Sequence, residues 1–327
     1  MKFPTKYWIP GAVIAALIVT ELTLRLVLGL GNPVLFQADA DTGYRYQPNR
    51  TVFRFGNKIE FNQYSQRSEA VITPKPQGML RILMTGDSIT NGGTLTDQTQ
   101  IISELLEARL AAKTQPVEVL NASAGSWGIG NQLAYLRKFG TFDSDAAIAQ
   151  IGTDDLIQPT STSDRVGHDP SYPDRPPVLA IQELLTRYAR PRLAHLLRLG
   201  SPSTNLSPPS PINLDRQFQE NLQHLSAIIT LVRTQRIPIF VLFTPNLNNL
   251  VPTFNEPKYK PELLQFLNAL RVSVIDAHQA WSTLPKTTVE TFYQPDGIHL
   301  TVAGNQAIAN LLFERLCTER QLPTCLL

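Results

Sequence analysis

A serine, an aspartate and a histidine with the spacing of a nucleophilic triad lie at opposite ends of this 327-residue chain. Ser88 follows Gly86-Asp87 directly after the apolar run 80–84, so we expect it in a turn at the end of a strand. Asp296 precedes His299 by three residues, which is close enough for the carboxylate to orient the imidazole. A serine hydroxyl needs a base within hydrogen-bond reach, and a histidine held by a carboxylate provides it. The pattern therefore predicts acyl transfer through a covalent intermediate on Ser88.

These motifs resemble those of the SGNH, or GDSL-type, esterase family, from about Leu80 to the C-terminus. That family carries its nucleophile in an early Gly-Asp-Ser motif and its acid and base in a late Asp-x-x-His motif. Two middle motifs of the family contribute donors to an oxyanion hole. Here one corresponds to Gly125, in a segment one residue short of the family's spacing from Asn121. The other reads Gly-Thr-Asp-Asp over 152–155, with Asp154 in the place of the family's asparagine.

The resemblance implies that the oxyanion is bound by the backbone N–H groups of Ser88 and Gly125 and by a side-chain amide. An ionised carboxylate at Asp154 cannot donate such a hydrogen bond, and it would repel the developing negative charge. Three alternatives stay open at this point. Asp154 is protonated and donates, or it points away from the site, or the protein is a weak or altered catalyst.

The resemblance also implies the reaction, which is hydrolysis of a carboxylic ester through an acyl-enzyme. Substrates in such a family include O-acetyl groups of cell-surface polysaccharide and lipid esters. One alternative is an O-acyltransferase that passes the acyl group to an extracytoplasmic glycan. Another is a catalytically inactive protein of the cell envelope that binds glycan.

Neither a cofactor nor a metal is expected. The remaining histidines, His168, His195, His224 and His278, have no metal-ligand spacing with acidic partners. The net charge is only +2 and the chain has no basic run, so we expect no nucleic-acid partner.

The N-terminus predicts a membrane anchor over residues 1–31. Lys2 and Lys6 precede an uncharged run that begins at Tyr7, and the apolar character continues through Glu21 and Arg25 to residue 30. Glu21 and Arg25 are four residues apart and can pair on one helix face. The lysines predict an inside N-terminus and a body outside the cytoplasmic membrane. A cleaved signal peptide with a site at 38–40, and a buried helix of a soluble protein, are the two alternatives.

Short apolar runs alternate with helical patterns from residue 80 onward, which indicates an α/β domain over 80–327. The expected strands are 81–84, 117–120, 146–151, 238–243 and 272–275, and the expected helices are 101–112, 133–139, 217–234, 262–270 and 303–316. The resemblance implies a flavodoxin-like, doubly wound parallel sheet. Ligands bind at the carboxyl ends of such strands, so Ser88, Gly125 and Asp154 are expected to meet there.

Three segments remain less clearly defined. Residues 32–79, here named the collar, contain alternating stretches at 51–55 and 59–61 that predict strands. Residues 157–213 form an insertion with ten prolines and a helical stretch at 178–199, which we interpret as a cap over the site or as a mobile surface excursion. Cys317 and Cys325 either form a disulfide or are unpaired thiols.

Overall fold

The catalytic part of the chain is built on one five-stranded parallel sheet. The computed structural model describes all residues except 1–7, 113–115, 191, 194–212 and 319–327. The strands are β5 (Leu80–Gly86), β6 (Val117–Ser123), β7 (Ala146–Gly152), β8 (Ile239–Thr244) and β9 (Ser273–Asp276). Their order in the sheet is β6-β5-β7-β8-β9, with every pairing parallel. This order confirms the flavodoxin-like arrangement, and all five predicted strands are present.

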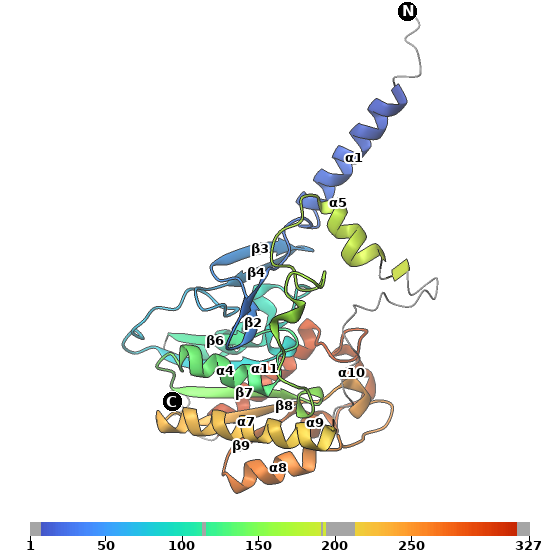
Figure 1. Ribbon diagram of the computed structural model, residues 1–327. Helices are drawn as coiled ribbons and strands as arrows, with labels where there is room; N and C mark the ends of the chain where they lie inside the picture. The colour runs from blue at the N-terminus through green and yellow to red at the C-terminus, as the bar shows by residue number, and fades with distance from the viewer. Residues whose placement is uncertain (1–7, 113–115, 191, 194–212, 319–327) are drawn as a thin grey trace, which may run out of the picture.

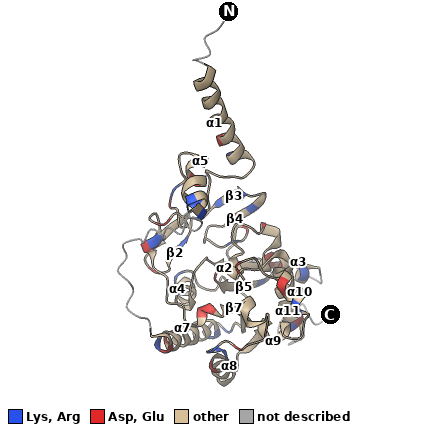
Figure 2. Cartoon of the chain, turned by 90° about the vertical axis from the view of Figure 1, so that its right-hand side faces the viewer, with Lys and Arg blue, Asp and Glu red and all other residues tan. Residues whose placement is uncertain are grey.

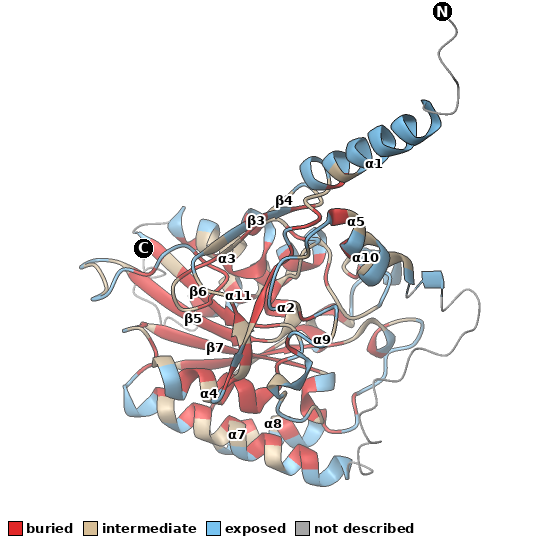
Figure 3. Ribbon diagram, turned by 45° about the horizontal axis from the view of Figure 1, so that its top comes forward, coloured by how far each residue is buried: buried red, intermediate tan, exposed pale blue. Residues whose placement is uncertain are grey.

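Continuous apolar sequence explains why these segments are central strands. Every residue of β5, β7 and β8 is buried, as expected for strands that are covered on both faces. Figure 3 shows the sheet as a buried layer inside more exposed helices.

Helices cover both faces of the sheet. On one face lie α4 (Ile129–Phe139), α7 (Leu214–Thr234) and α8 (Lys260–Ala269), whose apolar residues share one core cluster. On the other lie α3 (Ile102–Ala111), α9 (Ala277–Trp281), α10 (Lys286–Thr291) and α11 (Val302–Thr318). The five predicted helices are therefore confirmed. Asp97 caps the 3-10 turn η2 (Gln98–Gln100), and α3 begins after this turn without a side-chain cap.

Shorter elements connect these layers. They are α2 (Ser88–Asn91), η3 (Asp154–Leu156), η4 (Ser163–Arg165), α5 (Ala180–Glu183), the π-helical turn η5 (Leu184–Ala189) and η6 (Leu247–Asn249). The helix predicted at 178–199 corresponds to α5 and η5, and most of its second half lies outside the described residues. Cys317 is disulfide-bonded, and Cys325 also lies outside the described residues.

The collar consists of two antiparallel hairpins that pack on the body of the five-stranded sheet domain. They pair β1 (Phe36–Asp39) with β2 (Gly43–Tyr46), and β3 (Arg50–Arg54) with β4 (Asn57–Phe61). The second hairpin matches the two predicted stretches, whereas the first was not predicted. Aromatic side chains of both hairpins belong to the same core cluster as the sheet face under α4. The collar therefore shares its core with the catalytic part.

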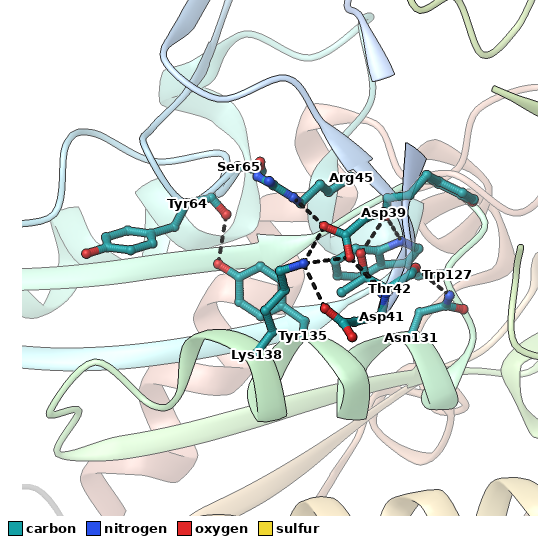
Figure 4. A network of polar contacts seen from close by, with 11 residues as sticks. Asp39, Asp41, Thr42, Arg45, Tyr64, Ser65, Trp127, Asn131, Tyr135 and Lys138 are labelled. Carbon is teal, nitrogen blue, oxygen red and sulfur yellow. Dashed lines mark hydrogen bonds and ion pairs between the residues drawn. The ribbon is translucent and has the colours of Figure 1, made fainter. Parts of the chain in front are cut away.

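A buried carboxylate fastens the first hairpin to α4 (Figure 4). Asp39 accepts hydrogen bonds from Lys138 on α4 at 2.7 Å, from Arg45 at 2.9 Å, and from the backbone N–H of Thr42 at 3.1 Å. Burial alone would raise the pKa of Asp39, but these donors outweigh it and hold that pKa well below its usual range. The carboxylate therefore stays ionised and ties the β1–β2 turn to a helix 99 residues further along the chain.

The helix α1 (Trp8–Leu26) stands away from the body (Figure 1). Its 19 residues have a mean hydropathy of 1.7, and only 6% of its apolar window is buried. Figure 2 shows the helix almost free of charged side chains. By length and composition it can cross a membrane, although a signal sequence has the same properties. An exposed helix of this kind does not fit the alternative of a buried helix in a soluble protein.

Candidate active site

Ser88 begins the short helix α2 directly after strand β5. Gly86, at the strand end, leaves no room for a side chain, since a Cβ there would lie 2.3 Å from Thr90 Oγ1 and 2.5 Å from Gln150 Oε1. Asp87 caps α2 by accepting a hydrogen bond from the Ile89 N–H at 2.7 Å. The Gly-Asp-Ser sequence thus produces a tight strand-to-helix turn that presents Ser88 at the carboxyl edge of the sheet.

The loop between α10 and α11 carries the acid and the histidine. Asp296 Oδ1 accepts hydrogen bonds from the backbone N–H groups of Ile298 and His299 at 2.9 Å each. Gly297, which follows Asp296 directly, has a φ of +70°. The other carboxylate oxygen, Oδ2, lies 2.7 Å from His299 Nδ1. The loop is therefore folded around the Asp296 carboxylate. Thr301 Oγ1 accepts the Gly304 N–H at 3.3 Å and so caps the start of α11.

His299 Nε2 lies 2.9 Å from Ser88 Oγ. Since the Asp296 carboxylate can only accept, the ring proton sits on Nδ1 and Nε2 is left to accept from the serine hydroxyl. Partial burial raises the pKa of Asp296, but the hydrogen bonds from the Ile298 N–H and from His299 lower it more, so the pKa is below its usual value. The acid is thus ionised beside the imidazole across the neutral pH range.

Two further carboxylates lie close to the nucleophile turn. Burial raises the pKa of Asp87 to about 6, against the opposing effect of the Ile89 N–H. Asp155 is almost fully buried, and burial followed by repulsion from Asp87 raises its pKa well above the usual value. Its Oδ2 accepts the Gly152 N–H at 2.7 Å, which folds the end of β7.

Gly125 follows the end of β6, as the sequence predicted. Its backbone N–H, however, donates to the hydroxyl of Tyr46 from the collar at 3.3 Å. The next residue, Ser126, adopts the left-handed conformation with a φ of +60°, and within the described part of the chain its N–H has no hydrogen-bond acceptor. Ser126 was not predicted from the sequence. The distance from Asn121 to Gly125 is one residue shorter than in the family, and this difference was the signal that could have indicated Ser126.

Asp154 follows the end of β7 and is exposed at the start of η3. Both of its carboxylate oxygens accept from Asn246 Nδ2 at 3.2 Å. Asn246 comes just after the end of β8 and was not predicted. The segment that holds it also reaches the histidine loop, because the Leu247 N–H donates to the Gly297 carbonyl at 2.8 Å.

A cavity of about 410 Å³ opens beside Ser88 and His299. Its walls are the segment after α2 and the loop before α11, with apolar contributions from Ile89, Leu95, Pro295 and Leu300. None of the described residues of the proline-rich insertion lines this cavity. The interpretation of that insertion as a cap stays a prediction for residues 194–212, which lie outside the described part.

A buried arginine of the collar holds one wall of this cavity. Arg67 donates to the carbonyls of Asn91 at 2.6 Å, Gly93 at 2.5 Å and Thr96 at 2.6 Å, and to Gln98 Oε1 at 3.3 Å. Burial lowers the pKa of the Arg67 guanidinium to about 10, so it remains charged. This role of Arg67 could not be predicted from the sequence, because all the hydrogen-bond partners of its side chain lie more than twenty residues away in the chain.

The chain matches one protein family and is similar in part to several solved structures. Residues 84–307 match the model of the GDSL-like lipase/acylhydrolase family. Among solved structures, the chain is similar to TesA, with 16% identity and a TM-score of 0.46 over 74% of this chain and 99% of that one. A lipase/acylhydrolase from Enterococcus faecalis has 18% identity and a TM-score of 0.46 over 73% and 95%. The acetyl xylan esterase AlAXEase has 13% identity and a TM-score of 0.46 over 72% and 100%.

The comparison with curated protein sequences gave no match. The family model covers well over half of the chain and includes the end of strand β5, Ser88 and the loop that carries Asp296 and His299. The chain therefore belongs to the GDSL-like lipase/acylhydrolase family of serine hydrolases that act on esters.

Proposed function

We propose that this protein is a membrane-anchored serine esterase in which Ser88 is the nucleophile, His299 the general base and Asp296 the residue that orients the base. The observation that carries this proposal is the unbroken series of contacts from Ser88 Oγ to His299 Nε2 at 2.9 Å and from His299 Nδ1 to Asp296 at 2.7 Å. As Ser88 Oγ attacks the ester carbonyl, its proton moves to Nε2, and the ionised Asp296 stabilises the imidazolium.

The imidazolium then gives that proton to the leaving alcohol, and the acyl group stays on Ser88. Water, deprotonated by His299 in its turn, attacks the acyl-enzyme and releases the acid. Both steps develop negative charge on the carbonyl oxygen, so they need hydrogen-bond donors at that position. The Ser88 N–H at the first turn of α2 is one such donor.

For the second donor we propose the backbone turn at Gly125 and Ser126. Gly125 was the sequence candidate, and its N–H contacts Tyr46 at a long 3.3 Å that leaves this bond easy to exchange. The unpartnered N–H of Ser126 is the alternative within the same turn, and its left-handed backbone supports it. Asp154, with both oxygens engaged by Asn246, is proposed to act on the site only through its charge.

The substrate class is a carboxylic ester, with O-acetyl groups of cell-surface polysaccharide and lipid esters as the candidates. The apolar side chains around the 410 Å³ cavity support an acyl group as its occupant.

The membrane anchor is proposed to stay attached. A signal-peptide cut at 38–40 would divide strand β1, whose residues Phe36 to Asp39 pair with Tyr46 to Gly43. It would also separate α1 and the apolar residues that follow it from the buried core, including Leu30 and Val34. We therefore propose a single-pass protein with its N-terminus inside and its catalytic body outside the cytoplasmic membrane.

The test of the chemistry uses the full-length protein in detergent with a short-chain aryl ester, and Ser88→Ala as the matched inactive control. We expect turnover and an acyl adduct on Ser88 that mass spectrometry detects after rapid acid quench. Absence of both would favour an inactive glycan-binding protein. Acyl transfer to an added sugar in preference to water would identify a transferase.

The anchor is tested in a bacterial host by extracting the membranes and by measuring the topology with a reporter fusion. The full-length protein is expected to remain with membranes after carbonate washing, and an alkaline phosphatase fusion after residue 40 is expected to be active. A soluble protein of reduced size would replace the anchor with a cleaved signal peptide.

A further inference from the structure

The last turns of α1 are fastened to the proline-rich insertion. Glu21 accepts the backbone N–H groups of Ala180 at 2.8 Å and Ile181 at 3.0 Å, and so caps the start of α5. Arg25 pairs with Glu21 at 2.6 Å and donates to the Val178 carbonyl at 2.7 Å. Two helices that are more than 150 residues apart in the chain are therefore joined at their ends.

A buried ion pair makes this attachment rigid. Arg54 on β3 contacts Glu183 on α5 at 2.5 Å and the Gly29 carbonyl at 3.0 Å. Glu183 also accepts the Gly31 N–H at 2.6 Å. Gly29, with a φ of +67°, lies so close to β3 that a Cβ would meet the Phe53 carbonyl at 1.9 Å.

Apolar packing completes the attachment. Leu24, Leu30 and Ala180 form a small core of their own, with Phe55, Leu184 and Tyr188 packed against it. We name this unit the junction and define it as residues 21–31, 50–55 and 178–188. Because it is tied by charge, backbone and apolar contacts at once, α1 keeps a fixed direction relative to the body.

Large apolar side chains on the junction are exposed around the point where α1 leaves it. Leu26 is 82% exposed, Val178 is 84% exposed and Phe53 is 64% exposed, and Val27, Leu179 and Leu185 are also exposed. Phe53 stands on β3 beside the buried Val52 and Arg54, so its exposure follows from the alternation of that strand. A group of this kind on one end of a soluble domain marks an interaction surface.

We propose that the junction rests on the lipid bilayer and inserts these side chains at the boundary between headgroups and acyl chains. The proposal rests on the anchor proposed above. A bilayer that receives the exposed side chains of α1 must meet the body where that helix ends, and both Figure 1 and Figure 3 place α5 and the β3–β4 hairpin at that end. The exposed apolar side chains of α1 and those of the junction then form one continuous surface.

Apolar contact rather than charge is expected to provide the affinity. A cavity of about 540 Å³ beside Val178 is lined by Arg175 and Arg187, but also by Asp169, Asp174 and the paired Glu183. Glu183 is paired with Arg54, so two arginines face two aspartates, and the cavity has no excess of positive charge that would select anionic lipid. The bilayer contact therefore fixes the height and tilt of the catalytic body through insertion, as in interfacial helices.

The test measures membrane depth at single cysteines that carry an environment-sensitive fluorophore. Full-length protein is reconstituted in phosphatidylcholine vesicles that contain lipids with a quencher at a shallow or a deep acyl position. Leu179→Cys and Leu185→Cys report on the junction, and Val13→Cys on α1. Leu214→Cys is the matched control, because Leu214 is 45% exposed against 49% for Leu179 and begins α7 at the opposite end of the body. Cys317 is disulfide-bonded, so labelling proceeds without reductant.

We expect shallow quenchers to act on positions 179 and 185, deep quenchers on position 13, and only aqueous iodide on position 214. If the fluorophores at positions 179 and 185 are quenched only by aqueous iodide, as at position 214, while position 13 is quenched by lipid, the junction does not touch the bilayer. The inference then fails although the anchor is confirmed. If 13 is not quenched, the anchor itself is wrong and the inference fails with it. Hydrolysis of a soluble aryl ester by each labelled protein establishes that it is folded.

Discussion

Asn246 Nδ2 donates to both carboxylate oxygens of Asp154, at 3.2 Å each. The side chain that stands in the place of the family's amide donor is therefore itself held by an amide from the neighbouring strand end. Both oxygens act as acceptors in this arrangement, so Asp154 presents acceptors near the carboxyl edge of β7 where the family has a donor.

Asp154→Asn is expected to raise kcat for an aryl ester, because it replaces a carboxylate by a neutral amide near the position where negative charge develops. One oxyanion donor typically changes kcat by ~100 to 1,000-fold, which sets the upper limit of the gain. The measurement is a pH–rate profile of both proteins, and the gain should be largest at high pH.

Other profiles have definite meanings. A wild-type rate that falls with rising pH, and that the substitution flattens, would mean that Asp154 is protonated and already donates. Equal profiles would mean that it points away from the reacting group. A large loss of activity at every pH would contradict all three alternatives and assign the carboxylate another role.

His299→Ala and Asp296→Asn are both expected to lose activity, the first more severely. The three groups act as a unit, so the double variant should be little worse than His299→Ala alone. We expect losses on the order of 10³-fold or more in kcat for the histidine variant, measured with a soluble aryl ester. Losses that multiply in the double variant would show that the two side chains work independently.

Arg67→Met is expected to lower the free energy of unfolding by more than about 3 kcal/mol. The substitution leaves three carbonyls in the cavity wall without a donor, and each buried unsatisfied group costs about 1–3 kcal/mol. Urea denaturation measures the loss, and Arg216→Met is the control, since Arg216 is an exposed arginine. A loss as small as that of the control would mean that the loop satisfies its carbonyls without Arg67.

Stability is expected to fall as pH rises above about 4, where an unfolded aspartate loses its proton. The folded state keeps the proton on Asp155, because burial raises the pKa of that carboxyl, and on Asp87 up to a pKa of about 6. The folded state then binds more protons than the unfolded state, so the free energy of unfolding decreases with pH in this window.

Asp155→Asn removes the contribution of Asp155 and should make the fall of the melting temperature above pH 4 less steep, while the contribution of Asp87 remains. Relative to wild type, the variant should gain most at the high end of the range. Asp143→Asn, at an exposed position with a positive φ that asparagine tolerates, serves as the control. Parallel pH curves for wild type and Asp155→Asn would show that Asp155 is not the titrating group.

The proximity of Ser88, His299 and Asp296 and the order of the sheet could be predicted because their signals are local. Ser88 lies in one motif, Asp296 and His299 in another, and continuous apolar runs mark the buried strands. Asn246 could have been found by the same reasoning that found Asp154, because it also follows the carboxyl end of a strand.

The contributions of the collar could not be predicted, because they depend on contacts across the fold. Tyr46 meets Gly125 from 79 positions away, and nothing in the sequence around Tyr46 specifies that partner. The strands β1 and β2 have only four residues each, too few for a periodic signal. The attachment of α5 to α1 likewise depends on side chains that look solvated in sequence, such as Glu21 and Glu183.

Ser88 and His299 are 211 residues apart in the chain, and the histidine loop lies between α10 and α11 on one face of the sheet. Contacts over such sequence distances form late, because the intervening chain must first become ordered. A nascent or partly folded chain therefore contains the serine long before it contains a base to activate it. Ester cleavage is thus expected only after the C-terminal segment has docked, and the onset of activity during refolding would report that docking.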